Sequence, residues 1–179
     1  MILASKSPRR SKILTGLGFA FKVVPTEAEE VSIPRAPKRT VTVNAARKLK
    51  ACRALFPDES IIAADTIVWF DNRIYGKPKT LEEAKEYLRE LSGNYHSVFT
   101  GVAWCKKGGA LETKVVESKV KFRELSEDLI EKYVAEVKPT DRAGAYDIDE
   151  SGGLIVERYE GSYENIMGLP VLSEFTELA

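Results

Sequence analysis

The chain has 179 residues, of which 44% are hydrophobic and 30% are charged, and its 27 basic and 27 acidic side chains give a formal net charge of zero. This length and composition are typical of a globular protein, and we expect one domain over residues 1–179. A net charge of zero excludes broad, charge-driven binding to nucleic acid or to a membrane surface. No apolar stretch approaches the roughly 18 residues of a membrane-spanning segment and no signal-peptide pattern opens the chain, so we expect a cytoplasmic location.

Apolar periodicity and helix-capping residues predict the elements of the chain. In the first half they predict, in order, a strand at 1–5, a helix from Ser7 to about residue 16, a strand at 21–24, an irregular acidic loop at 26–40, a helix at 42–56, a strand at 60–70 and a helix at 80–93. In the second half they predict strands at 97–105 and 111–122, a helix at 126–137, short strands around two glycine-bearing turns, and an apolar helix after Pro170.

The middle of the chain indicates the fold class. Residues 60–70, SIIAADTIVWF, are a nearly unbroken apolar run with β-branched residues, which is typical of a central strand covered on both faces. The runs at 97–105 and 111–122 flank KKGG, which is a hairpin signal. Alternating elements followed by a long hairpin indicate an α/β domain with a mixed sheet rather than a purely parallel one.

Asp65 is the most informative residue, because it stands inside the apolar run, in AADTIV. An unpaired buried carboxylate is costly, so such a residue usually meets a cation, a metal ion or hydrogen-bond donors. The alternative is an aspartate at a strand end that caps the following turn. Thr66 comes next and, in a regular strand, points to the opposite face.

Arg9 and Arg10 lie where the first strand gives way to a helix. Two cations in the first turn of a helix oppose its dipole, and a bound anion would remove that unfavourable interaction. The free N–H groups of a helix start and the guanidinium forks both favour phosphate. The pair is therefore a candidate phosphate site, and a solvated helix start is the alternative.

Glu30, in the acidic loop, is a candidate partner for Asp65, because two carboxylates can hold a hard divalent ion such as Mg²⁺. A loop whose acidic residues are simply solvated is the alternative. Lys50, in the helix at 42–56, and Lys77, in the turn YGKPK, offer point charges for a phosphate. Most lysines, however, only solvate a surface.

Two other patterns leave their role open. The single histidine, His96, has no nearby serine or cysteine with which to form a nucleophile–base pair, which favours a structural role in its turn. The segment AGAYDIDESGG contains Asp147 and Asp149, which either face a ligand or line a turn. The chain has neither a dinucleotide-binding nor a P-loop glycine pattern, so a phosphate would have to be bound by arginine, lysine and metal.

Six collinear stretches together resemble the Maf family of nucleoside triphosphate pyrophosphatases: LASKSPRR (Leu3–Arg10), AADTIV (Ala63–Val68), YGKP (Tyr75–Pro78), LSGNYHSVFTGV (Leu91–Val102), DRAGAYDI (Asp141–Ile148) and GSYENIMGLP (Gly161–Pro170). The resemblance covers nearly the whole chain. It implies an elongated mixed sheet flanked by helices, with two lobes around a cleft, as in the inosine triphosphate pyrophosphatases. It also implies hydrolysis of the α–β phosphoanhydride of a nucleoside triphosphate to a monophosphate and pyrophosphate, dependent on Mg²⁺ or Mn²⁺.

The resemblance assigns roles to residues of this chain. Asp65 matches the family's catalytic carboxylate, which accepts a proton or activates water and, with Glu30, would hold the metal. Arg9 and Thr66 match residues of substrate recognition, and Arg10 belongs to the same motif. Lys77 matches a lysine of the active site.

Two assignments depart from a simple match. Lys50 is placed in the substrate site, with Lys48 as the alternative alignment. Asp149 stands where the relatives that prefer dTTP and UTP usually carry glutamine, and an ionised carboxylate only accepts hydrogen bonds whereas an amide also donates them.

The family is also associated with arrest of septum formation, so a nucleotide-binding regulator without turnover is the alternative function. Association into a homodimer is left open.

Overall fold

The structure is a computed structural model that describes residues 1–149 and 151–178. In this part of the chain the strands form one seven-stranded mixed sheet, in the order β2-β1-β3-β5-β6-β7, with β4 paired to β3 off this path. The strands are β1 (Ile2–Leu3), β2 (Lys22–Val23), β3 (Ile61–Phe70), β4 (Arg73–Tyr75), β5 (Tyr95–Cys105), β6 (Glu112–Phe122) and β7 (Val156–Glu160). The helices are α1 (Pro8–Gly16), α2 (Pro37–Leu55), α3 (Leu81–Leu91), α4 (Glu127–Val137) and α5 (Tyr163–Met167), with short 3-10 helices at Ala143–Ala145, Gly152–Leu154 and Ser173–Leu178.

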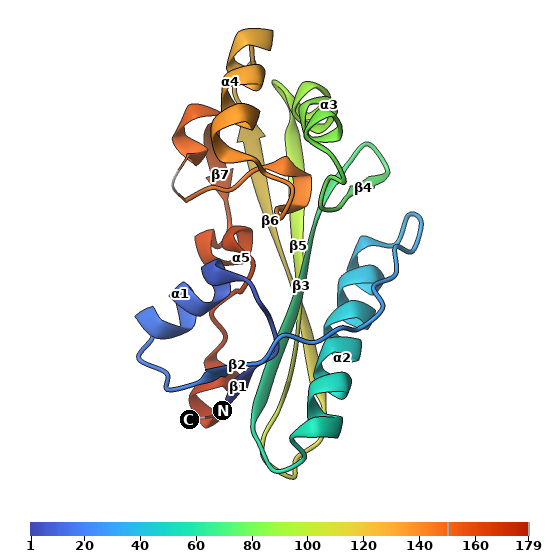
Figure 1. Ribbon diagram of the computed structural model, residues 1–179, viewed down its shortest axis with the longest axis vertical. Coiled ribbons are helices and arrows are strands. Elements are labelled where there is room, and N and C mark those ends of the chain that lie inside the picture. Colours follow the sequence, from blue (N-terminus) through green and yellow to red (C-terminus); the bar gives the residue numbers. More distant parts are fainter. Residues whose placement is uncertain (150, 179) are drawn as a thin grey trace.

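The sheet is elongated because three long antiparallel strands, β3, β5 and β6, run along the molecule (Figure 1). In the described residues, both parallel pairings involve β1, which lies between β2 and β3. Helices α1 and α2 lie toward the β1–β2 end, and α3 and α4 lie at the opposite end (Figure 1). The predicted elongated mixed sheet flanked by helices is confirmed.

The structure corrects the start of one predicted helix and the type of another. Helix α2 begins at Pro37 rather than near residue 42, because Pro37 suits the first helical turn, where its missing N–H is not needed. The acidic loop is correspondingly shorter. The segment after Pro170 forms a 3-10 helix at Ser173–Leu178 in place of the predicted apolar α-helix. None of the helices in the described ranges is long and apolar enough to cross a membrane.

Helix α2 packs unusually close to the sheet, and Gly101 of β5 allows this. A Cβ atom at Gly101 would lie 2.5 Å from the carbonyl carbon and oxygen of Val41. Since backbone cannot yield as a flexible side chain does, only glycine fits. The close approach brings the face of α2 that carries Asn44 and Lys48 against β3, where both side chains reach Asp65.

A gap in the sheet lies beside the middle of β3. On this side β3 pairs with β1 only through Ile61 and Ile62, and with β4 only from Val68 onward. The edge of residues 63–67 between these partners is therefore not covered by a strand. Consequently Asp65 and Thr66, although they point to opposite faces of β3, both reach the space at this edge.

Candidate active site

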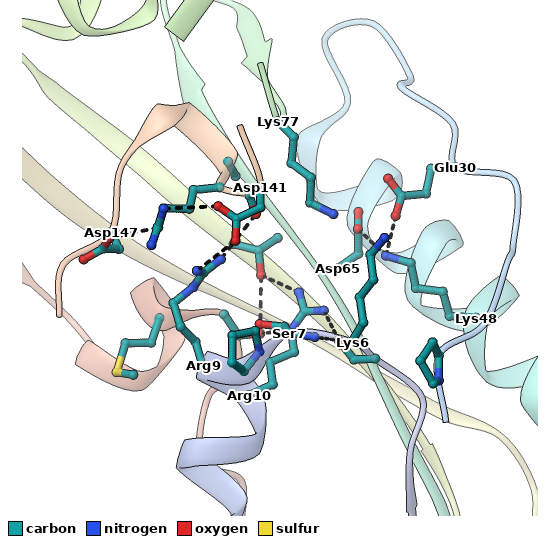
Figure 2. Close-up of a pocket in the computed structure, with 18 of the residues that line it drawn as sticks. Lys6, Ser7, Arg9, Arg10, Glu30, Lys48, Asp65, Lys77, Asp141 and Asp147 are labelled. Atoms are coloured by element: carbon teal, nitrogen blue, oxygen red, sulfur yellow. Dashed lines mark hydrogen bonds and ion pairs between the residues drawn. The ribbon is translucent and has the colours of Figure 1, made fainter. Parts of the chain in front are cut away.

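A pocket of about 510 Å³ occupies this gap. Its walls come from four parts of the chain, namely residues 4–10 around the start of α1, the loop at 25–30, the segment 141–147, and residues 166–168 at the end of α5. Side chains of α2, of β3 and of the turn after β4 complete it. Figure 2 shows Glu30, Asp65 and Lys48 on one side, Asp147 on the other, and Arg9 and Arg10 between them.

Two carboxylates converge on one ammonium group. The Lys48 Nζ atom lies 2.7 Å from Glu30 Oε1 and 2.8 Å from Asp65 Oδ1. Asp65 is only 6% exposed, and its second oxygen, Oδ2, accepts a hydrogen bond of 3.0 Å from Asn44. Asp65 is thus a buried carboxylate with charged and neutral donors, and it does not cap a turn.

The cations around Glu30 favour its charged form. Partial burial acts to raise the pKa of the Glu30 carboxyl, but the hydrogen bond and charge of Lys48, with the charges of Lys77 and Arg10, bring that pKa below its usual value. For Lys77, desolvation in the pocket and the neighbouring cations Lys48 and Arg10 lower the pKa, although Glu30 opposes them. The Lys77 side chain points toward the two carboxylates (Figure 2).

The two adjacent arginines are held differently. The guanidinium of Arg10 donates to three groups of the protein, with distances of 2.8 Å to the Gly168 carbonyl oxygen, 3.0 Å to Ser5 Oγ and 3.2 Å to Thr66 Oγ1. Among the described residues, Arg9 makes only long contacts with Asp141, at 3.4 Å to its carbonyl oxygen and 3.8 Å to Oδ2. Arg10 therefore links α1 to β3 and to the end of α5, whereas more of the N–H donors of Arg9 are left for a ligand.

Thr66 belongs to the same hydrogen-bond network as Arg10. Its Oγ1 lies 2.9 Å from Thr100 Oγ1 and accepts the hydrogen bond from Arg10. The start of α1 is also ready for an anion. Its N-cap residue, Ser7, makes no side-chain capping bond to the first-turn N–H groups. Those N–H groups belong to residues that line the pocket, as expected for a phosphate site at a helix start.

The far end of the pocket contains a buried ion pair. Arg142 Nε lies 2.9 Å from Asp147 Oδ2, and the Asp147 residue is only 7% exposed. The neighbouring wall includes Tyr146, whose hydroxyl lies 2.8 Å from His96 Nε2. His96 is structural, as the sequence suggested, but it supports the pocket wall rather than its own turn.

Two residues chosen from the sequence lie outside the pocket. Lys50 is exposed, and Lys48 lines the pocket where Lys50 was expected. Each residue of a helix is rotated by about 100° from the one before, so two positions along the helix the side chain points to the opposite face. The structure thus places Lys48, and not Lys50, against Glu30 and Asp65. Asp149 lies 2.5 Å from Lys12 Nζ and 3.3 Å from the Tyr163 hydroxyl, and it does not line the pocket.

Three groups that sequence reasoning passed over do contact the site. Asn44 hydrogen-bonds Asp65, and Asp141 and Arg142 line the pocket. For Asn44 the only available signal was a polar residue that falls one helical turn before Lys48. For Asp141 and Arg142 the signal was the motif DRAGAY, which by itself names no partner.

A buried carboxylate and a more exposed one, which together meet several cations in a pocket at the open edge of a mixed sheet, define a site suited to a polyanionic ligand such as a phosphate ester. A family model described as Maf-like protein matches residues 1–179. The chain therefore belongs to the Maf family.

Curated relatives agree with this assignment. The chain is 46% identical to a dTTP/UTP pyrophosphatase of Pyrococcus abyssi, over 96% of this chain and 90% of the relative. It is 44% identical to a dTTP/UTP pyrophosphatase of Dictyoglomus thermophilum, over 96% of this chain and 91% of the relative. A solved structure, the Staphylococcus aureus Ham1 protein, is similar over 68% of this chain and 70% of its own, at 14% identity and a TM-score of 0.47.

Proposed function

We propose that the chain is a nucleoside triphosphate pyrophosphatase that hydrolyses dTTP and UTP to the monophosphate and pyrophosphate. The observation that carries the proposal is the convergence of Glu30 and Asp65 on one cation, in a pocket that Arg9 and Lys77 also enter. The names of the relatives at 42–46% identity support the reaction and the choice of pyrimidine nucleotides.

The carboxylate pair fits a divalent ion. Glu30 Oε1 and Asp65 Oδ1 face the same point, and an ammonium group already lies between them. In the described part of the chain no group of three or more His, Cys, Asp and Glu side chains could hold a metal, so the protein would supply only these two ligands. Mg²⁺ and Mn²⁺ accept such a site because water and phosphate oxygens complete their coordination. When bound there, the ion supplies positive charge to the phosphate oxygens at which negative charge develops.

The side chains of the pocket divide the remaining work. Arg9, Lys77 and the free N–H groups at the start of α1 bind the triphosphate, and Arg10 holds the shape of the pocket between α1, α5 and β3. Asp65 takes the proton of a water that attacks the α-phosphorus. The bond from that phosphorus to the α–β bridging oxygen breaks, and pyrophosphate leaves with its charge compensated by the cations.

The base would lie at the end of the pocket formed by Tyr146 and the Arg142–Asp147 pair, because Lys77 and the two carboxylates lie at the other end and Arg9 lies between the two. Direct recognition of the base by Asp149 is not part of this proposal, since its carboxylate lies against Lys12 and Tyr163. The nucleotide is the proposed partner of the single domain. A cytoplasmic location is proposed with it.

The test is release of pyrophosphate from dTTP, UTP, CTP and 7-methyl-GTP with Mg²⁺ or Mn²⁺. We expect turnover of dTTP and UTP, and we expect Asp65→Asn to lower kcat by at least about 100-fold because the proton acceptor is lost. The matched control is Asp58→Asn, which changes an exposed aspartate after α2. Nucleotide binding without pyrophosphate release would favour the regulator instead, and full activity of Asp65→Asn would remove Asp65 from the mechanism.

A further inference from the structure

The loop that carries Glu30 has no regular structure, yet side chains of α2 hold it in place. Three side chains on one face of α2, spaced four and three residues apart, form hydrogen bonds with the backbone of this loop. They are Thr40, Asn44 and Arg47. Thr40 Oγ1 accepts from the N–H of Ile33, and Arg47 Nη1 donates to the carbonyl oxygen of Glu29. This arrangement satisfies backbone groups that no neighbouring strand could pair.

Asn44 differs from the other two because it also contacts Asp65. Its Oδ1 accepts from the N–H of Val31 at 2.8 Å, and its Nδ2 donates to the Val31 carbonyl oxygen at 2.9 Å and to Asp65 Oδ2 at 3.0 Å. Both N–H bonds of the amide are thus in use. The opposite orientation of the amide would place its oxygen against a carbonyl and a carboxylate, so only one orientation satisfies all three contacts.

Asn44 is only 3% exposed, and Val31 directly follows Glu30. One rigid amide therefore joins the carboxylate of β3 to the loop residue next to the second carboxylate. We propose that Asn44 is a positioning residue that sets the separation between the Asp65 and Glu30 carboxylates at the value a divalent ion requires. This inference rests on the proposed metal site, and hydrogen-bond partners of metal-binding carboxylates commonly act in this way.

Lys48 cannot replace this link. It contacts both carboxylates at 2.7 Å and 2.8 Å, but it is a flexible chain whose ammonium lies where the ion is proposed to bind. Once an ion takes that position, Asn44 is the side chain in the described part of the chain that still contacts both Asp65 and the loop.

The test is a titration of the protein with Mn²⁺ in the absence of nucleotide. The concentration of free Mn²⁺ is measured by electron paramagnetic resonance. We expect Asn44→Ala to raise the Kd for Mn²⁺ about 10- to 100-fold, and Asn44→Leu, which fills the space without hydrogen bonds, to do the same. With nucleotide, we expect kcat to fall more than KM rises, because the phosphate-binding cations are untouched.

The matched control is Thr40→Val. It removes the hydrogen bond to the same loop from an equally buried residue that does not contact Asp65. We expect a comparable loss of thermal stability with a Kd for Mn²⁺ within about twofold of the original protein, since the carboxylate keeps its partners. Unchanged Mn²⁺ affinity in the folded Asn44 variants, or an equal loss in Thr40→Val, would overturn the inference.

Three further outcomes distinguish a failure of this inference from a failure of the function on which it rests. If Asp65→Asn binds Mn²⁺ as tightly as the original chain, the metal site itself is wrong. If neither Asn44 variant folds at a temperature at which Thr40→Val is folded, Asn44 is needed for the fold and the positioning role is rejected. If Mn²⁺ binding weakens as expected but no nucleotide is hydrolysed, the inference stands and the proposed reaction fails.

Discussion

Lys48 is the residue on which the charge of the pocket depends. Its side chain is 11% exposed, and the Asp65 side chain that it pairs with is 8% exposed, so neither charge is well solvated. Removing one partner of such a pair leaves the other charge uncompensated, which is far more costly than losing a surface ion pair. The same ammonium would compete with the proposed metal ion for the two carboxylates.

This competition gives a prediction for Lys48→Met. We expect the variant to lose roughly 3 kcal/mol of stability in metal-free buffer. We also expect it to bind Mn²⁺ more tightly than the original chain, because no ammonium has to be displaced. Thermal unfolding with and without Mn²⁺, together with a titration of Mn²⁺, measures both effects.

Lys50→Met provides the comparison, because Lys50 lies on the same helix with its side chain in solvent. We expect its stability to stay within about 0.5 kcal/mol of the original and its Mn²⁺ affinity to be unchanged. A larger effect from Lys50→Met than from Lys48→Met would restore the assignment made from the sequence.

At the scale of elements, the distance between α2 and β5 decides whether the site exists. Helix α2 supplies Asn44 and Lys48 to Asp65 and also holds the loop of Glu30. All of these contacts depend on the approach of Val41 to Gly101, where there is no room for a side chain. A small outward shift of α2 would separate both carboxylates from their partners.

We therefore expect Gly101→Ala to destabilise the protein by about 1–3 kcal/mol, since its methyl group would meet the backbone of Val41. We also expect Mn²⁺ binding to weaken, although residue 101 does not touch the ligands. Thermal denaturation and the Mn²⁺ titration measure the two effects. Gly16→Ala is the control, because a Cβ atom there has nothing within 4 Å at the end of α1. A stable Gly101→Ala variant with full Mn²⁺ affinity would contradict the dependence on this approach.

At the scale of the whole molecule, His96 couples the pocket wall to the core. The residue is 3% exposed, packs edge-on against Phe122 at 4.8 Å between ring centroids, and lies beside the Tyr146 hydroxyl. Burial lowers the pKa of His96 to about 3. In the unfolded chain a histidine has a pKa of about 6.5. The unfolded state therefore binds a proton that the folded state excludes over the range between these two values.

The sign of the resulting pH dependence follows from this difference. The contribution is absent above pH 6.5 or so and destabilises the fold progressively as the pH falls toward 3. Between pH 7.5 and pH 5, His96 should remove about 2 kcal/mol from the free energy of unfolding. Because the chain has one histidine, His96→Phe should abolish this part of the pH dependence, whatever it does to the absolute stability. Urea unfolding of His96→Phe and of the original protein at several pH values measures the free energy of unfolding. The same pH dependence in the two proteins would contradict a buried, neutral His96.

Much of the element pattern was predictable from local signals. The apolar run of β3, the hairpin of β5 and β6, and the capping residues Thr80 and Ser126 are all as expected, with Thr80 and Ser126 accepting from the N–H groups of Glu83 and Leu129. These features depend on residues close in the chain, so propensity and periodicity are sufficient. The start of α2 was misplaced, because the helix begins at a proline within a stretch that reads as a loop.

By itself, the sequence determined that the carboxylate of Asp65 lies in an apolar strand and that Arg9 and Arg10 stand at the start of the first helix, since both features follow from neighbouring residues. Only the tertiary structure decided the partners of that carboxylate. Lys48 rather than Lys50 reaches Asp65, Asn44 links it to the loop, and Asp149 lies outside the pocket. The physical reason is that these contacts depend on how α2 rotates and how closely it packs. The rotation and the position of α2 depend on its packing against Gly101, which is more than fifty residues away along the chain. A pattern of neighbouring residues cannot indicate a contact between segments so far apart in the sequence.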